Sequence, residues 1–113
     1  MSWKSGQKEA YSRELVAATL ARSRGDAQSE FAHLERAHIL GQRYTIAHTL
    51  THWRMFRFGL RRRNIREVFG QVVRMLAALT KSRIWVPLGN TGGANVNPFR
   101  PMPVPEDLRA YVD

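Results

Sequence analysis

The sequence predicts an all-α fold: four helices arranged as a double helical hairpin, then a Pro/Gly-rich C-terminal arm and a short final helix. Apolar residues recur at helical spacing, connections of about two to five residues separate the periodic stretches, and all five prolines lie after Val86. At 113 residues with 43% hydrophobic content, the chain can bury one modest core. We expect a helical bundle over residues 1–85 and an arm with a closing helix over 86–113, packed on the same domain.

The first two helices are separated by a clear turn signal. The helical spacing of Tyr11, Leu15, Ala18 and Arg22, which share one face, predicts the first helix. Gly25 then supplies the left-handed residue that ends a helix, and Asp26 can accept from the unpaired amides at the start of the next. The second helix carries an apolar stripe that reaches His38, and Gly41 ends it.

The third and fourth helices follow with equally short connections. Thr45 is the predicted N-cap of the third helix, which runs to about Leu60. Asn64, followed three residues later by Glu67, is close to a capping box and predicts the start of the fourth. The apolar face of that helix consists of Val68, Phe69, Val72, Leu76 and Leu79. Short connections make neighbouring helices antiparallel, which gives a pair of helical hairpins.

The first hairpin contains a more specific pattern, "LARSRGDAQSEFAHLERAHIL". It resembles a tetratricopeptide-type (TPR) hairpin, in which a Gly-Asp turn is followed by small and aromatic residues at helical spacing. The repeat is not evident a second time, and solenoids normally need about three repeats. We therefore expect a TPR-like hairpin rather than a TPR array.

The composition changes at residue 86. The stretch "VPLGNTGGANVNPFRPMPVP" is too rich in proline and glycine to continue a helix. A loop of this length is unusual in a small domain, so we expect an arm that packs over the bundle through Trp85, Phe99 and Met102. The closing "EDLRAYV" reads as a short helix.

Three of the four histidines lie within fifteen residues. The predicted turn between the second and third helices can bring them together. His48 and His52 are four residues apart, so they project from one helical face. If the turn centres near Arg43, His38 faces His48 across it. Glu35 precedes His38 by three residues, a Glu-x-x-His unit familiar from metal sites in helix bundles. A site of three histidines, with Glu35 as a possible fourth ligand, is therefore constructible.

The same histidines also have a purely structural interpretation. A histidine at a helix interface commonly bonds to a backbone carbonyl, a threonine or a water, and Thr45, Thr49 and Thr51 are available. Spacing alone favours this interpretation over metal binding. If a metal does bind, imidazole ligands suit copper and zinc without choosing between them. His33 belongs to a differently oriented half-motif and is expected at the surface.

The chain is strongly basic, with eighteen Lys and Arg against nine Asp and Glu and a net charge of +9. Such a charge attracts acidic proteins or nucleic acid. The densest basic patch consists of Arg54, Arg57, Arg61, Arg62, Arg63 and Arg66. No motif of a nucleic-acid-binding fold accompanies it, so a solvated basic face is the simpler interpretation.

Several functional classes have little support. The absence of cysteine removes disulfides, thiolate metal sites and cysteine nucleophiles. The nine carboxylates form no arrangement with serine and histidine that indicates catalysis, so we expect a non-enzyme. No secretory signal and no membrane-length apolar stretch is visible, which leads us to expect a cytoplasmic protein without a membrane partner. The oligomeric state is left open.

The stretches "AHILGQRYTIAHTLTHW", "RRRN" and "GNTGGANVNPFRPMP" resemble a small bacterial helical family of unknown function, over roughly residues 10–112. Its members are often encountered beside heavy-metal and copper resistance or efflux genes. The resemblance implies an accessory protein in metal handling, and the family's histidine stretch matches at His38, His48 and His52. The leading expectation is therefore a non-enzymatic copper- or zinc-binding protein. The alternative is a metal-free TPR-like adaptor whose basic face binds an acidic protein or nucleic acid.

Overall fold

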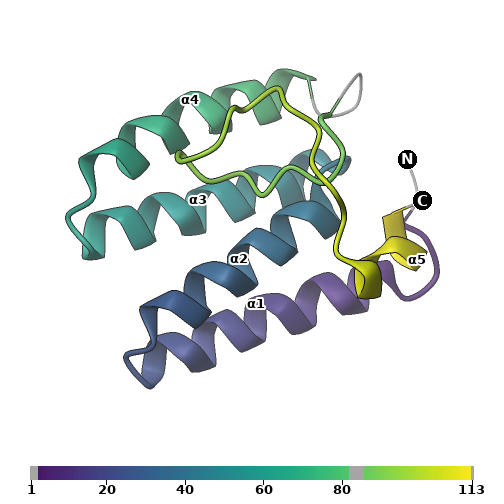
Figure 1. Ribbon diagram of the computed structural model, residues 1–113, viewed down its shortest axis with the longest axis horizontal. Helices are drawn as coiled ribbons and strands as arrows, with labels where there is room; N and C mark the ends of the chain where they lie inside the picture. Colours follow the sequence, from purple (N-terminus) through teal and green to yellow (C-terminus); the bar gives the residue numbers. More distant parts are fainter. Residues whose placement is uncertain (1–2, 82–85, 113) are drawn as a thin grey trace.

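The computed structural model describes residues 3–81 and 86–112, and within them the predicted all-α architecture is confirmed (Figure 1). Four main helices pack as two antiparallel hairpins, α1 on α2 and α3 on α4, and α2 also packs on α3. A short C-terminal segment closes the chain. Its bounds and those of the helices are α1 Gln7–Ser23, α2 Ala27–Gly41, α3 Thr45–Arg61, α4 Ile65–Lys81, the 3-10 turn η1 Glu106–Leu108 and α5 Arg109–Val112. No helix in the described ranges is long and apolar enough to cross a membrane.

Of the three predicted N-caps, two are confirmed and one is shifted by a residue. Asp26 Oδ1 accepts from the amide of Ser29 at 3.0 Å, and Gly25 before it has a φ of +73°. Asn64 Oδ1 accepts from the amide of Glu67 at 3.1 Å, which starts α4. The shift is at α3, where the N-cap is Tyr44 and not Thr45, the first helical residue.

The hydrophobic core forms two clusters along the first hairpin. The larger gathers the ends of α1, α2 and α3 with the closing segment and consists of Ala10, Tyr11, Ala37, Ile39, Leu40, Ala47 and Leu108. The smaller consists of Ala18, Leu34 and Met55. Tyr11 ties the first cluster together, since its hydroxyl donates to Ala47 O at 2.9 Å and lies 3.0 Å from Thr51 Oγ1. These contacts hold α1, α2 and α3 at fixed positions.

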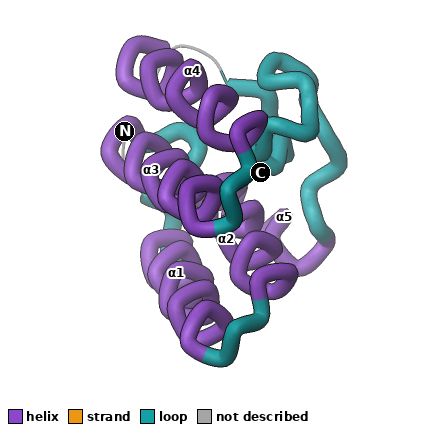
Figure 2. The backbone as a smooth tube through the Cα atoms, turned by 90° about the vertical axis from the view of Figure 1, so that its left-hand side faces the viewer, coloured by secondary structure: helices purple, strands orange, loops and turns teal. Residues whose placement is uncertain are grey.

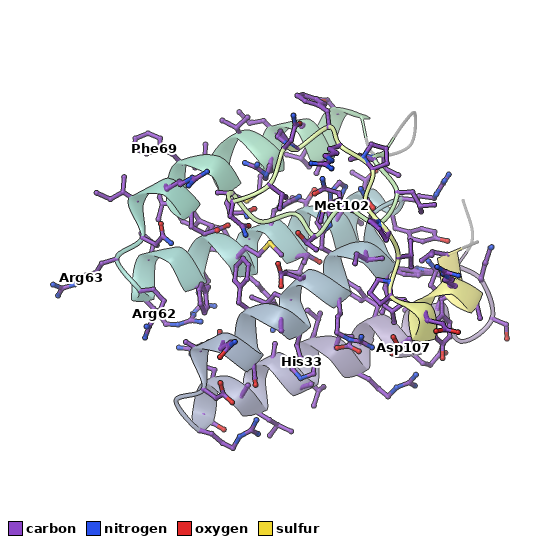
Figure 3. All side chains as sticks on the ribbon, viewed as in Figure 1. His33, Arg62, Arg63, Phe69, Met102 and Asp107 are labelled. Carbon is purple, nitrogen blue, oxygen red and sulfur yellow. The ribbon has the colours of Figure 1, made fainter. Side chains whose placement is uncertain are left out.

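The fourth helix is oriented with its apolar side outward. The predicted apolar residues do share one face, but apart from the half-buried Val68 that face is exposed. Its large side chains, each 41–71% exposed, are Ile65, Phe69, Val72, Val73, Leu76 and Leu79. Phe69 points away from the bundle (Figure 3). The face of α4 that packs inward carries Glu67 and Gln71, which are 6% and 0% exposed.

The third helix has one side toward solvent and the other toward the interior. On one side Ile46 and Trp53 are 84% and 46% exposed. On the other side His48, His52 and Met55 are buried. The interior of the second hairpin is therefore lined by polar side chains to an unusual degree, and these side chains need partners.

The arm after residue 86 supplies many of those partners. It runs back along the open side of α2, α3 and α4 before reaching α5 (Figures 1 and 2). The amide of Ala94 donates to the carboxylate of Glu67, and Arg74 Nη2 donates to Val96 O at 2.8 Å. Of the predicted apolar anchors, Met102 is half-buried, Phe99 is 64% exposed and Trp85 lies outside the described residues.

Candidate metal centre

The three histidines of the predicted site meet inside the bundle. His38 Nε2 lies 3.0 Å from His48 Nε2 and 3.1 Å from His52 Nε2. The donor atoms of all three rings lie within 4.8 Å of one another. Each imidazole therefore directs one nitrogen to a common point, and such a set can hold a metal ion.

The short connection between α2 and α3 explains why the rings converge. His48 and His52 are four residues apart on α3 and share the face that packs on α2. The short connection between the helices brings His38, near the end of α2, back opposite His48. The predicted pairing of these two residues across the turn is thus confirmed by their contact.

The second nitrogen of two rings is held by an acceptor. Nδ1 of His38 lies 2.7 Å from the backbone oxygen of Asn90, and Nδ1 of His52 contacts Gln71 Oε1. The amide of Gln71 is oriented by its own nitrogen, which donates to Gly92 O at 2.8 Å and to the Glu67 carboxylate. Oxygen acceptors facing both Nδ1 atoms place the ring protons there, by inference from the hydrogen-bond partners.

That assignment leaves Nε2 of His38 and Nε2 of His52 without protons. A neutral imidazole carries one N–H, so Nε2 of His38 and Nε2 of His52 both present lone pairs. The two lone pairs face each other at 3.1 Å. Two acceptors at this distance repel unless a cation lies between them, and ligands of a tetrahedral zinc ion at 2.0–2.1 Å would be separated by about 3.3 Å. The observed spacing is close to that value.

Burial keeps the rings neutral. His38 and His52 are each 2% exposed and His48 is 8% exposed. Burial lowers the pKa of His48 to about 4, and burial followed by the charge of His48 lowers the pKa of His52 to about 3. The pKa of His38 lies well below its ordinary value because of burial and the two neighbouring rings. Neutral imidazole is the form that binds metal, so no proton has to leave at pH 7.

The arm approaches the histidines closely enough to require a glycine. Gly92 has a φ of +85°, and a Cβ at this position would lie 2.5 Å from His38 Cδ2. Its amide donates to Asn90 Oδ1 at 2.9 Å, while Asn90 Nδ2 donates to Asn97 O and Arg100 O at 2.8 Å each. This folded loop holds the carbonyl of Asn90 over His38.

Glu35, the predicted fourth ligand, lies apart from the converging nitrogens. It is half-buried, and burial together with the charge of Glu67 raises the pKa of its carboxyl group. The set of donor atoms within 4.8 Å consists of the three histidines without Glu35. His33, expected at the surface, is half-buried, and its Nδ1 lies 2.7 Å from Glu14 Oε1.

The residues of the predicted basic patch fall into two groups. Arg54 donates to Thr19 Oγ1 at 3.4 Å and Arg61 forms an ion pair with Glu30, so both are engaged within the fold. Arg57, Arg62, Arg63 and Arg66 are exposed, as is Arg61 despite its ion pair. Figure 3 shows Arg62 and Arg63 at the turn between α3 and α4, with Arg63 pointing away from the molecule.

A protein-family model described as "Protein of unknown function (DUF3703)" matches residues 5–112. The chain belongs to the DUF3703 family. Neither the comparison with curated proteins nor the comparison with solved structures finds a match. The histidine cluster of this DUF3703 protein must therefore be interpreted from its own geometry.

A small cavity of about 120 Å³ borders the histidines of the DUF3703 chain. Besides the three imidazoles and Asn90, Gln42 and Arg74 contribute polar side chains to its wall. The sequence did not single out these two residues, nor Gln71, Asn90 and Gly92. The segment "GNTGGAN" was a usable signal, because clustered Gly and Asn favour a tight turn, but the pattern does not indicate which helix the turn contacts.

Proposed function

We propose that this protein binds a transition-metal ion, copper or zinc, between α2 and α3 through Nε2 of His38, His48 and His52. The convergence of unprotonated Nε2 atoms from His38 and His52 carries the proposal. Two imidazole lone pairs directed at each other repel, whereas a bound cation turns that repulsion into attraction. Three nitrogen ligands without thiolate suit Zn²⁺ and Cu²⁺.

The surroundings of the site support the same function. Histidines that bind metals usually donate their other N–H to a carbonyl or a carboxylate, which orients the ring. The Asn90 carbonyl has this role for His38 and the Gln71 side chain has it for His52. Because the acceptors come from the arm and from α4, separate parts of the chain converge to hold the ligand rings.

The biological role that we propose is accessory rather than catalytic. The resemblance to proteins found beside copper and heavy-metal resistance genes suggests metal homeostasis, as a cytoplasmic protein that stores or delivers the ion. The cluster is almost completely buried, which suits retention of a metal better than rapid turnover of a large substrate.

Thermal unfolding of chelator-treated protein, titrated separately with Zn²⁺ and Cu²⁺, tests this function. A ligand that binds the folded state raises the melting temperature as its concentration rises, by roughly 2.7 kcal/mol of stability at a hundred times Kd. We expect this shift in the wild type and in a His33→Ala control, whose histidine lies outside the cluster. We expect none in the double variant His48→Ala/His52→Ala. Equal shifts in the double variant would refute the proposal.

A second candidate function is favoured by the distribution of charge. Between Glu35 and Glu106 the only acidic residue is Glu67, and it is 6% exposed. The outer surface of the second hairpin therefore combines exposed arginines with the exposed apolar face of α4. Nucleic-acid interfaces are mainly polar, so this combination fits an acidic protein that also carries apolar side chains.

Fluorescence anisotropy with two probes tests this candidate: a Glu-rich amphipathic helical peptide and a short DNA duplex. We expect the peptide to bind, with affinity that falls as salt rises. Arg62→Gln/Arg63→Gln and Phe69→Ser/Leu76→Ser should each weaken it, while His48→Ala/His52→Ala should not. Binding of DNA alone, or a doubled molecular mass in solution that Phe69→Ser/Leu76→Ser abolishes, would assign the face to nucleic acid or to a second copy instead.

A further inference from the structure

The cavity beside the histidines is placed to admit a ligand to the metal. Its volume is about 120 Å³, or room for about four waters at ~30 Å³ each. The three histidines lie on its wall, together with apolar side chains such as Val73, Ala78 and Phe99. Zinc prefers four ligands, and three-histidine sites characteristically keep the fourth position open. Among the described residues no further His, Asp or Glu joins the cluster.

Two polar atoms on the cavity residues have no hydrogen-bond partner among the described residues. Gln42 is 2% exposed, and its Nε2 donates to Pro87 O at 2.9 Å, which leaves Oε1 unpaired. Arg74 donates through Nη1 to Gly70 O and through Nη2 to Val96 O, while its buried Nε is unpaired. Buried polar atoms without partners are uncommon, and one donor and one acceptor from residues of the same cavity wall suit a small polar ligand.

The charge of the cavity indicates which kind of ligand it is. An arginine side chain stays protonated, so Arg74 adds a positive charge to that of a divalent metal. The carboxylate of Glu67 is a negative group whose charge acts on Arg74, but the Gln71 amide and the amide of Ala94 already engage it. An anion in the cavity would offset both cations.

We infer that the metal keeps one coordination position for a small exchangeable anion, which occupies the cavity, accepts a hydrogen bond from Arg74 Nε and, when it carries a proton, donates one to Gln42 Oε1. The inference rests on the proposed metal site. A cavity of about 120 Å³ has room for a small anion such as hydroxide, azide or hydrogen carbonate.

Cobalt(II) is the probe for this inference, because it replaces zinc and its visible absorption bands report the ligands. Binding of Co²⁺ with intense bands, abolished in His48→Ala/His52→Ala, tests the metal site by itself. Azide is then titrated into the Co²⁺ protein in chloride-free buffer. We expect saturable changes in the bands, and at least a tenfold weaker azide affinity in Arg74→Met. The exposed Arg57 on α3 provides the control, and Arg57→Gln should bind azide as the wild type does.

The outcomes separate the two proposals. Absence of Co²⁺ bands refutes the metal site, whereas normal Co²⁺ bands that azide does not change refute only the open position. Unchanged azide affinity in Arg74→Met also contradicts the inference. If Arg74→Met fails to fold, the wild type still decides: azide should bind more tightly than uncharged imidazole, and a preference for imidazole would overturn the anion assignment.

Discussion

Asn90 and His38 are 52 residues apart in the sequence, yet the backbone oxygen of Asn90 lies 2.7 Å from His38 Nδ1. The arm is therefore part of the candidate metal centre and not a cover added to a finished bundle. It fixes the proton on Nδ1 of His38 and thereby leaves Nε2 free to bind a cation. Changes in the arm should consequently affect metal binding even though the arm contributes no ligand.

Gly92→Ala is the most direct test of the arm. The new Cβ would lie 2.5 Å from the His38 ring, and alanine is disfavoured at a φ of +85°. We expect at least a tenfold loss of Zn²⁺ affinity, measured by competition with a chromophoric chelator, and a loss of roughly 1–3 kcal/mol of stability in urea unfolding. Full metal affinity would show that the arm does not position His38.

Gly25→Ala is the matched control for that experiment. Gly25 has a similar φ of +73°, but a Cβ there would meet nothing within 4 Å. It therefore measures the backbone penalty alone, about 1–2 kcal/mol. We expect Gly25→Ala to lower stability and to leave Zn²⁺ affinity unchanged.

Gln71 should influence metal affinity through His52. Gln71→Leu removes the acceptor that faces His52 Nδ1 and also the amide that binds Gly92 O. Loss of such an outer partner typically lowers metal affinity by about 10–100-fold. We expect a decrease in this range in a Zn²⁺ competition assay, with no change for Gln28→Leu, whose side chain is exposed on α2. Wild-type affinity in Gln71→Leu would mean that the ring of His52 is oriented by other contacts.

Acid should destabilise the metal-free protein through the buried histidines. Burial holds the pKa of His48 at about 4 and that of His52 at about 3, whereas histidines of an unfolded chain titrate near 6.5. Below pH 6.5 the unfolded chain therefore binds more protons, and the free energy of unfolding falls by up to about 1.4 kcal/mol per pH unit for each histidine. Above pH 6.5 the histidines are neutral in both states, and the free energy of unfolding keeps its full value.

Urea unfolding of the metal-free protein between pH 7.5 and 4.5 measures this dependence. We expect a continuous loss of stability with decreasing pH, and a shallower loss in a His48→Gln/His52→Gln variant, which has two fewer titrating groups. A flat profile in the wild type would contradict the burial of neutral histidines.

Glu35→Gln tests whether Glu35 binds the metal or only lies near the histidines. The carboxyl group of Glu35 has a raised pKa because of burial and the nearby Glu67. Its stabilising contribution is present at low pH and lost as pH rises through the folded-state pKa. A neutral glutamine should therefore raise the melting temperature at neutral pH and leave Zn²⁺ affinity unchanged. A large loss of affinity would instead show that Glu35 binds the metal.

The local parts of this architecture were predictable because local chemistry determines them. Asp26 and Asn64 cap their helices through hydrogen bonds to residues three positions later. The contact of His38 with His48 follows from one short turn between two helices. Helical periodicity and turn residues contain this information.

The remainder depends on contacts across long stretches of sequence. Periodicity identifies the apolar face of α4 but not its direction, and the structure points Phe69 outward because the opposite face binds the arm through Glu67 and Gln71. The partners of His38 and His52 likewise lie on segments whose docking no local pattern determines. Sequence therefore located the three histidines of the cluster but not the residues that orient them.

X-ray absorption spectroscopy of the zinc-loaded protein tests the central claim most directly. The account predicts three imidazole nitrogens at about 2.0–2.1 Å and one further light atom. It also predicts one fewer imidazole in His48→Ala and an unchanged spectrum in His33→Ala. Fewer than three imidazoles in the wild type, or a spectrum unaffected by His48→Ala, would show that His38, His48 and His52 do not bind the metal.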